Sequence, residues 1–135
     1  MPIFYKSGYK YQLVKDYSIE TVIVGSLMDL DFLKLTPNGV LTIRDGYAWD
    51  GPSGPVIDSP DTMRASLVHD AVYQLLRSGL DAKWKNAADE LLYRLCIEDG
   101  MNILTAKLIW QGVQWFGRPF TQPSHEAAII SAGKR

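Results

Sequence analysis

Residues 61–77 read D-T-M-R-A-S-L-V-H-D-A-V-Y-Q-L-L-R, and their spacing is that of a helix with one buried face. Apolar residues recur there at intervals of three and four, as the core-facing stripe of an amphipathic helix requires; they are Ala65, Val68, Val72, Leu75 and Leu76. Asp61 or Ser59 can cap the start, because a short polar side chain accepts free backbone N–H groups. Ser78-Gly79 can end it as a glycine cap. We therefore predict a helix from about 61 to 77.

Two more segments with helical spacing follow. The first covers about 84–98, and Asp-Gly at 99–100 stops it. Its apolar positions are Ala87, Leu91, Leu92, Leu95 and Cys96. The second covers about 102–116, is the most apolar of the three, and ends at Gly-Arg-Pro in 117–119. Helices joined by such short turns predict a three-helix core, with the first two as an antiparallel pair.

The residues before Trp49 have a different composition. Short runs of β-branched and aromatic residues, separated by turn residues, are typical of strands; they cover Tyr9–Val14, Ile19–Val24, Phe32–Leu35 and Val40–Ile43. Asn-Gly at 38–39, within Thr36-Pro37-Asn38-Gly39, is a strong turn signal, and Asp45-Gly46 indicates another turn. We predict one α+β domain over 1–135. Its parts are a small antiparallel β meander in 1–48, a Gly/Pro loop in 49–60, helices in 61–118 and a peripheral tail in 119–135.

The composition excludes several classes of function. Fourteen Lys and Arg against fifteen Asp and Glu give a net charge of −1, whereas nucleic-acid-binding proteins normally carry a basic face. One cysteine, Cys96, excludes an internal disulfide and a cysteine-based zinc site, and two histidines are too few for a multi-histidine cluster. The start, M-P-I-F-Y-K-S-G-Y-K, lacks the apolar core of a signal peptide. No segment has the ~20 apolar residues of a membrane span. We therefore expect no nucleic-acid partner, no signal peptide and no transmembrane segment.

Residues 66–73, S-L-V-H-D-A-V-Y, place polar side chains on the first predicted helix. His69 and Tyr73 are four apart and share a face, and Ser66 lies three before His69. On the second helix Asp89 lies within an apolar stripe, and a carboxylate that is buried there must be paired. Asp89 is either paired with His69 and Tyr73 or a surface residue beside Glu90. The first alternative would fix the imidazole tautomer and leave the other ring nitrogen to act as a base.

The loop before this helix, W-D-G-P-S-G-P in 49–55, can hold a cation. Its glycines allow close approach of the backbone and its prolines stiffen it, so that carbonyl oxygens are held in a fixed array. Together with Asp50 and Asp70, this loop makes an all-oxygen site of the kind that Ca²⁺ prefers. Such a cation would polarise a carbonyl or phosphoryl oxygen while His69 activates water. Ser53 is disfavoured as a nucleophile, because Pro55 stands where the nucleophile elbow has glycine.

These residues together resemble a family found mainly in tailed phages and prophages, the domain of unknown function 1353. The likeness lies in D-G-x-S-x-P at 50–55, a spacer, H-D-x-x-Y at 69–73 and an Ala-Asp in the next helix. It covers about 40–117 and includes F-G at 116–117. More distantly, the chain is similar to bacterial and fungal secreted phospholipases A₂. Those enzymes place a calcium loop with an Asp-Gly-x-Ser-like segment before a helical His-Asp-x-x-Tyr and a second-helix Asp.

The similarity to phospholipases A₂ implies a role for each matching position. His69 would be the general base, Asp89 would orient it, and Tyr73 would bond Asp89. The calcium ligands would be Asp50, Gly51 and Asp70. We expect the substrate contacts to be Trp49, Ser53 and Ser66. The chain departs from these secreted enzymes in one respect, because they are stapled by disulfides and a lone cysteine cannot form one.

Two functions from different classes follow as expectations. The first is a small phage-type hydrolase that uses activated water on an ester, either a phospholipid or another cell-envelope substrate. The second is a non-enzymatic phage protein, either a virion or tail accessory component or a host-directed binding protein. Its partners would be phage structural proteins or a host protein, and exposed apolar residues on the third helix would favour it. For both, the resemblance implies the host cytoplasm or the virion as the location.

Overall fold

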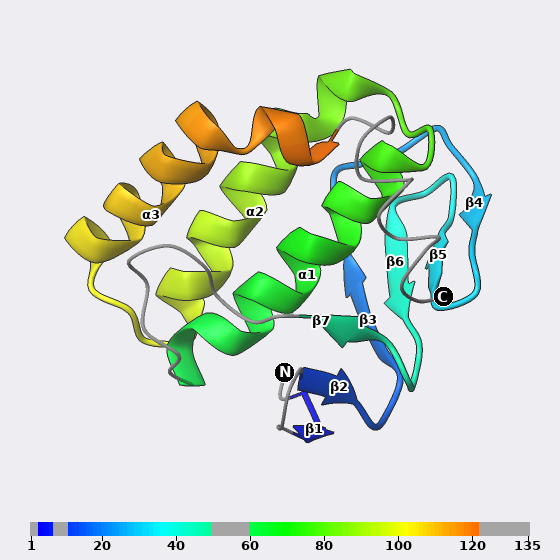
Figure 1. Ribbon diagram of the computed structural model, residues 1–135, viewed down its shortest axis with the longest axis horizontal. Coiled ribbons are helices and arrows are strands. Elements are labelled where there is room, and N and C mark those ends of the chain that lie inside the picture. Colours follow the sequence, from blue (N-terminus) through cyan, green and yellow to red (C-terminus); the bar gives the residue numbers. More distant parts are fainter. Residues whose placement is uncertain (1–2, 7–10, 50–59, 122–135) are drawn as a thin grey trace.

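Short strands come first in the fold and helices follow, as Figure 1 shows. The computed structural model describes residues 3–6, 11–49 and 60–121. The strands are β1 (Tyr5–Lys6), β2 (Tyr11–Leu13), β3 (Tyr17–Glu20), β4 (Met28–Asp29), β5 (Leu33–Leu35), β6 (Val40–Ile43) and β7 (Ala48–Trp49). The helices are α1 (Pro60–Arg77), α2 (Lys85–Glu98) and α3 (Ile103–Phe116), with 3₁₀ turns η1 (Ala82–Trp84) and η2 (Arg118–Thr121). The predicted α+β class and the three helices are confirmed.

The described strands form two antiparallel sheets, ordered β1-β2-β7 and β3-β6-β5-β4. In the larger sheet, alternate residues of β5 and β6 are buried, as the two-residue period of a strand requires. The register sets Leu33 opposite Ile43 and Leu35 opposite Leu41. These four side chains belong to one apolar core with the buried residues of α1 and α2. This face of the sheet therefore supports the helices that carry the site.

The two predicted turns are confirmed by the backbone. Gly39 has φ +92° and its N–H donates to the Thr36 carbonyl at 2.9 Å. Gly46 has φ +100° and follows Asp45, and the Tyr47 N–H donates to the Arg44 carbonyl at 3.0 Å. Both glycines adopt the left-handed conformation, which is strained for residues with a Cβ atom.

Three of the predicted strands are too long, and the one predicted over Phe32–Leu35 begins one residue later, at Leu33. The strand predicted over Ile19–Val24 ends at Glu20. Thr21 Oγ1 accepts the Ile23 N–H at 3.1 Å, and Gly25 has φ +92°, so the chain turns out of the sheet there. The strand predicted over Tyr9–Val14 is observed over Tyr11–Leu13, and its first two residues lie outside the described part.

Helix α1 buries the predicted apolar stripe and ends where predicted. All five stripe positions are buried: Ala65, Val68, Val72, Leu75 and Leu76. Past its end, Gly79 has φ +119° and the Leu80 N–H donates to the Leu75 carbonyl at 2.9 Å, which is the geometry of a glycine C-cap. The proposed caps, Ser59 and Asp61, lie outside the described side chains.

Helices α1 and α2 lie side by side and run in opposite directions (Figure 1). Near the start of α1, Arg64 bonds to Asp99, which follows the end of α2. Further along α1, Tyr73 bonds to Asp89, which lies earlier in α2. The predicted antiparallel pair is therefore present, and it brings polar residues of the two helices together at two levels.

Helix α3 packs against α2 on the side away from α1 (Figure 1). Its inner side contributes Ala106, which is buried, and Ile109 and Val113, which are partly buried against the core. Its outer side leaves large apolar side chains exposed: Ile103, Leu104, Leu108 and Trp115. Among the described residues, no helix combines the length and the apolar character that crossing a membrane would require.

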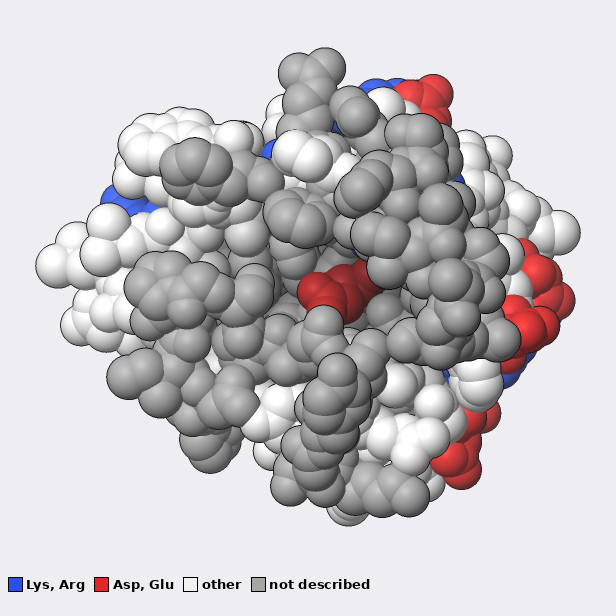
Figure 2. Space-filling view, viewed as in Figure 1, with Lys and Arg blue, Asp and Glu red and all other residues white. Residues whose placement is uncertain are grey.

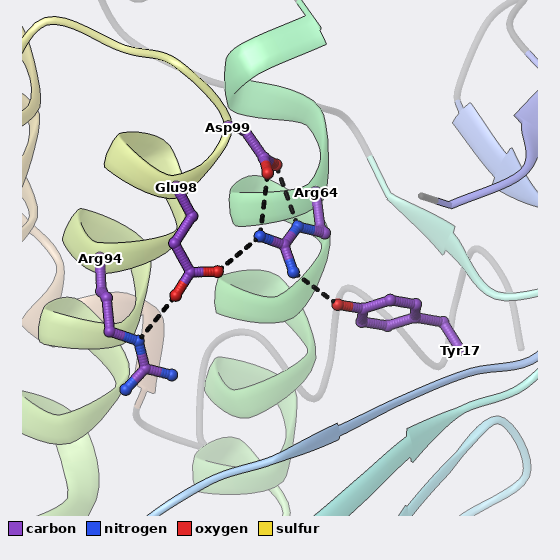
Figure 3. A network of polar contacts seen from close by, with 5 residues as sticks. All are labelled: Tyr17, Arg64, Arg94, Glu98 and Asp99. Atoms are coloured by element: carbon purple, nitrogen blue, oxygen red, sulfur yellow. Dashed lines mark hydrogen bonds and ion pairs between the residues drawn. The ribbon is translucent and has the colours of Figure 1, made fainter. Parts of the chain in front are cut away.

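Buried Arg64 joins α1 to the sheet and to the end of α2 (Figure 3). Its guanidinium forms a two-bond pair with Asp99 at 2.9 and 3.0 Å and donates to Glu98 at 2.9 Å. The remaining nitrogen donates to the hydroxyl of Tyr17 in β3 at 2.9 Å. Burial alone would lower the pKa of Arg64, but the bonds to Asp99, Tyr17 and Glu98 outweigh it and raise this pKa.

Replacing Arg64 with methionine is expected to lower the free energy of unfolding by about 2–3 kcal/mol. The loss comes from the Tyr17 hydroxyl, left buried without its partner, and from the two-bond pair with Asp99. Arg94→Met is the control, because Arg94 makes one exposed contact of 3.5 Å to Glu98 and such pairs contribute about 0–1 kcal/mol. Urea unfolding measures both variants. If Arg64→Met and Arg94→Met are equally stable, the bonds of Arg64 do not contribute to the stability of the fold.

Candidate active site

The carboxylate of Asp89 lies between the helices with 0% exposure and accepts hydrogen bonds from four side chains. On Oδ1, His69 Nε2 lies at 2.8 Å and the Tyr73 hydroxyl at 2.6 Å, both from α1. On Oδ2, Lys85 Nζ lies at 2.7 Å and Gln114 Nε2 at 2.8 Å, from α2 and α3. Asp89 is therefore a buried, paired residue, and the alternative of a surface residue beside its neighbour in α2 is wrong.

The pKa of Asp89 lies below its ordinary value. Burial by itself would raise this pKa, because a carboxylate loses its hydration. The hydrogen bonds from His69, Lys85 and Tyr73 stabilise the charged form and outweigh that effect. Asp89 is consequently an ionised group that can only accept hydrogen bonds at neutral pH.

An ionised Asp89 determines the tautomer of His69. Because the carboxylate has no proton to give, the imidazole must donate from Nε2, and in a neutral ring Nδ1 is then the nitrogen that accepts a proton. The Tyr73 ring lies against the imidazole with its centroid 4.1 Å away. His69 is 8% exposed, so its ring is held by packing as well as by the carboxylate.

Tyr73 remains a neutral donor in this arrangement. Burial raises the pKa of its phenol, and the nearby charges of Asp89 and Asp70 raise it further. The hydroxyl therefore keeps its proton and holds Asp89 Oδ1 together with His69. His69, Asp89 and Tyr73, the three residues predicted as catalytic, are in direct contact.

Two residues that bond Asp89, Lys85 and Gln114, were not predicted from the sequence. Lys85 stands four residues before Asp89, a spacing that places oppositely charged side chains together on a helix and could have identified it. Gln114 had no such signal, because its contact depends on how α3 packs against α2. The Lys85 ammonium also donates to the Val113 carbonyl at 3.2 Å, so it ties α3 to the same carboxylate.

Trp49 and Ser66, two of the predicted substrate contacts, bond to each other. The Trp49 indole N–H donates to Ser66 Oγ at 2.9 Å, and that hydroxyl donates to the Met63 carbonyl at 2.9 Å. Both residues are buried. The pair connects β7 to α1 one turn before His69. It therefore helps to position the helix that carries the imidazole. Ser53, the third predicted contact, lies outside the described residues.

The predicted calcium ligands are described only in part. Asp50 and Gly51 lie outside the described residues, whereas Asp70 is partly exposed on α1, next to His69. Within the described part of the chain, no three His, Cys, Asp or Glu side chains come close enough together to hold a metal ion. Of the three predicted ligands, Asp70 is therefore the one that lies in the described part of the chain.

Gly117 leaves the space that the Tyr73 hydroxyl occupies. A Cβ atom at this buried position would overlap that hydroxyl and the Val113 carbonyl. We expect Gly117→Ala to displace Tyr73 from Asp89 and to lower the free energy of unfolding by about 1–3 kcal/mol. Gly112→Ala is the matched control, because its Cβ meets nothing within 4 Å and alanine favours a helix by about 0.5–1 kcal/mol. Thermal unfolding measures both, and a Gly117→Ala protein as stable as Gly112→Ala would contradict the expectation.

No protein-family model, curated protein or solved structure matches the chain. The geometry around Asp89 is therefore the basis for assigning a function.

Proposed function

We propose that the chain is a small hydrolase of the phospholipase A₂ type, in which His69 acts as general base on a water molecule that attacks an ester. One observation carries the proposal. The ionised carboxylate of Asp89 holds His69 through Nε2 and is itself held by Tyr73, which leaves Nδ1 to accept a proton. This is the arrangement of residues that the similarity to phospholipases A₂ leads one to expect.

In the proposed reaction, the water oxygen bonds to the ester carbonyl carbon while one of its protons passes to His69 Nδ1. The imidazolium that forms lies 2.8 Å from the Asp89 carboxylate, which stabilises its charge. When the tetrahedral intermediate collapses, the C–O bond to the alcohol breaks and the proton on Nδ1 passes to the departing oxygen. Lys85 and Tyr73 keep Asp89 ionised and in place throughout.

The substrate and the metal belong to the proposal as well. A phospholipid is the ester that the similarity to phospholipases A₂ favours, and an ester of another cell-envelope component is the alternative. Ca²⁺ would polarise the carbonyl oxygen, with Asp70 and the residues at 50–51 as its ligands. We also infer membership of the phage family of unknown function 1353, with the host cytoplasm or the virion as the location.

The test is the release of fatty acid from phospholipid vesicles by the purified chain, with Ca²⁺ or with a chelator. We expect release by the unaltered chain with Ca²⁺ and none by His69→Ala under the same conditions. Equal release by both proteins would remove His69 from the mechanism. If the chelator leaves the release of fatty acid unchanged, the mechanism does not use Ca²⁺, and His69 as general base is unaffected by that result.

A binding function is the second candidate, and the outer side of α3 favours it. Ile103, Leu104, Leu108 and Trp115 are between 52% and 71% exposed. In Figure 2 the described atoms at the α3 end of the molecule are mostly white, with a blue patch of Lys or Arg among them. Exposed apolar surface of this kind is typical of a protein-binding site. A phage structural protein or a host protein would cover this surface. A chain with this binding function alone would release no product from any ester.

A further inference from the structure

Helix α3, the outermost helix of the layer in Figure 1, is apolar on two opposite sides. Its inner side packs on the core through Ala106, Ile109 and Val113. Its outer side carries a second row of exposed residues, the outer stripe, which consists of Leu104, Leu108, Gln111 and Trp115. At about 100° of turn per residue, these four positions fall within about 60° of arc, opposite the inner side. Because a helix that is apolar all round is normally buried, the outer stripe calls for a cover.

The chemistry of the outer stripe restricts what can cover it. None of its four residues is charged, and Lys107, beside the stripe, is the one charged residue of α3. Its polar member, Gln111, has an amide that both donates and accepts hydrogen bonds. A strongly acidic or basic partner would therefore find no opposite charge in the stripe. An apolar helix face with a single amide suits it, and α3 itself presents such a face.

The spacing of the outer stripe matches itself when one copy is turned end for end. Its residues are separated by intervals of four, three and four, which read the same in both directions. Intervals of three and four are also those of the seam between two packed helices. In an antiparallel pair, Leu104 would meet Trp115 of the second copy, and Leu108 would meet its Gln111. Self-complementary contacts with two-fold symmetry are the commonest kind in soluble oligomers.

The area of this surface is sufficient for a reversible dimer. The three apolar side chains of the outer stripe expose roughly 300 Å² per copy, at about 150–250 Å² for a fully accessible aromatic side chain and about 100 Å² for leucine. Gln111 and the exposed neighbours Ile103, Thr105 and Lys107 add a similar area. Two copies would therefore bury about 1,000 Å² in total, which is the low end for a specific interface.

We propose that the outer stripe binds the outer stripe of a second copy of this chain, in an antiparallel pair of α3 helices related by a two-fold axis. The axis passes between Leu108 and Gln111, so the two Gln111 amides lie beside it and each can donate to the other. A polar residue in such a seam fixes the register. The two Lys107 ammoniums do not oppose each other, because they lie on either side of the axis, about 8 Å apart along the helices.

This pairing goes beyond the proposed hydrolase and does not rest on it. It also accounts for the exposed apolar surface of α3 without a phage or host protein. A dimer would therefore remove the observation that favours the binding function.

Sedimentation equilibrium of the full chain over a range of concentrations tests the pairing, in the unaltered protein, Leu108→Glu and Leu27→Glu. Leu108 and Leu27 are 70% and 65% exposed, so both variants are expected to fold. Leu27 precedes β4 and is not part of the outer stripe, which makes it the matched control. We expect a dimer with a Kd of about 1–100 µM in the unaltered protein and in Leu27→Glu. We expect dimerisation at least about 100-fold weaker in Leu108→Glu, because symmetry places two carboxylates in the seam.

Disulfide cross-linking tests the orientation of the two helices. Leu104→Cys and Trp115→Cys are oxidised separately and as a mixture, above the measured Kd, and the native Cys96 is buried. We expect linked dimers in the mixture alone, because in an antiparallel pair the two copies of either residue lie about 16 Å apart along the helices.

The proposal fails if the unaltered chain stays monomeric, if Leu108→Glu dimerises as tightly as the unaltered chain, or if one cysteine variant links to itself. A monomer would leave a phage or host protein as the occupant of the outer stripe. None of these outcomes depends on ester hydrolysis, so the hydrolase is tested separately.

Discussion

Asp89→Asn is expected to lower the free energy of unfolding by about 3–5 kcal/mol, as removal of one partner of a buried ion pair does. The carboxylate accepts from four donors, and asparagine would turn one oxygen into a donor that faces two others. Lys85 would lose the charge that compensates it, while its side chain is 16% exposed. For a small domain, a loss of this size corresponds to a fall in Tm of about 10 °C or more.

Glu90→Gln is the matched control for this prediction. Glu90 is the next residue on α2 and is exposed, so its charge is expected to change stability by no more than about 0.5 kcal/mol. Urea unfolding at neutral pH compares the two variants with the unaltered chain. An ordinary hydrogen bond contributes roughly 1 kcal/mol to stability. If the free energies of unfolding of Asp89→Asn and Glu90→Gln differ by less than about this amount, the four-donor network is not what stabilises the helix pair.

The same carboxylate has a defined pH signature. Its folded-state pKa is lowered, mainly by His69, Lys85 and Tyr73 acting against the effect of burial. The stability that it contributes is therefore fully present above the unfolded pKa of about 4 and is lost as the pH falls through the lower folded value. The difference in stability between the unaltered chain and Asp89→Asn should shrink when unfolding is measured at successively lower pH below about 4.

His69→Gln is expected to reduce the proposed ester hydrolysis by about 10²–10⁴-fold, the usual contribution of a general base. The glutamine amide can still donate to Asp89, so the carboxylate keeps a partner, but it cannot accept a proton from water. The fold is expected to survive, which separates this variant from Asp89→Asn. Initial rates of fatty-acid release measure the effect, alongside a thermal unfolding curve.

The control for this variant is His125→Gln, because His125 is the other of the two histidines in the chain. It removes an imidazole that has no role in the proposed mechanism and should leave the rate unchanged. A His69→Gln protein as active as His125→Gln would show that the network around Asp89 is a structural device. The binding function would then be the better account of the chain.

The helical half of the fold follows from local patterns. Intervals of three and four residues place the buried stripe of α1, and Gly79 and Gly100 end the first two helices in the left-handed conformation. The contact of His69 and Tyr73 with Asp89 could be predicted for a different reason. A carboxylate on an apolar stripe needs partners, and these two were the donors with matching spacing.

The strand half was less predictable because its elements are short. The strands β1, β4 and β7 have two residues each, too few for a two-residue period to be visible. Their pairing depends on contacts between distant segments, such as Tyr11 with Trp49. The division into two sheets and the place of Gln114 in the site depend in the same way on tertiary packing, which local patterns do not encode.

The tautomer of His69 tests the central claim most directly, because it needs no knowledge of the substrate. Nitrogen-15 NMR of the histidine rings at neutral pH, with signals assigned through His125→Gln, reports which ring nitrogen carries the proton. The account predicts that the neutral ring of His69 carries its proton on Nε2, bonded to Asp89, and leaves Nδ1 to accept a proton. A neutral His69 with its proton on Nδ1 would contradict it, because the proposed base would then have no free site.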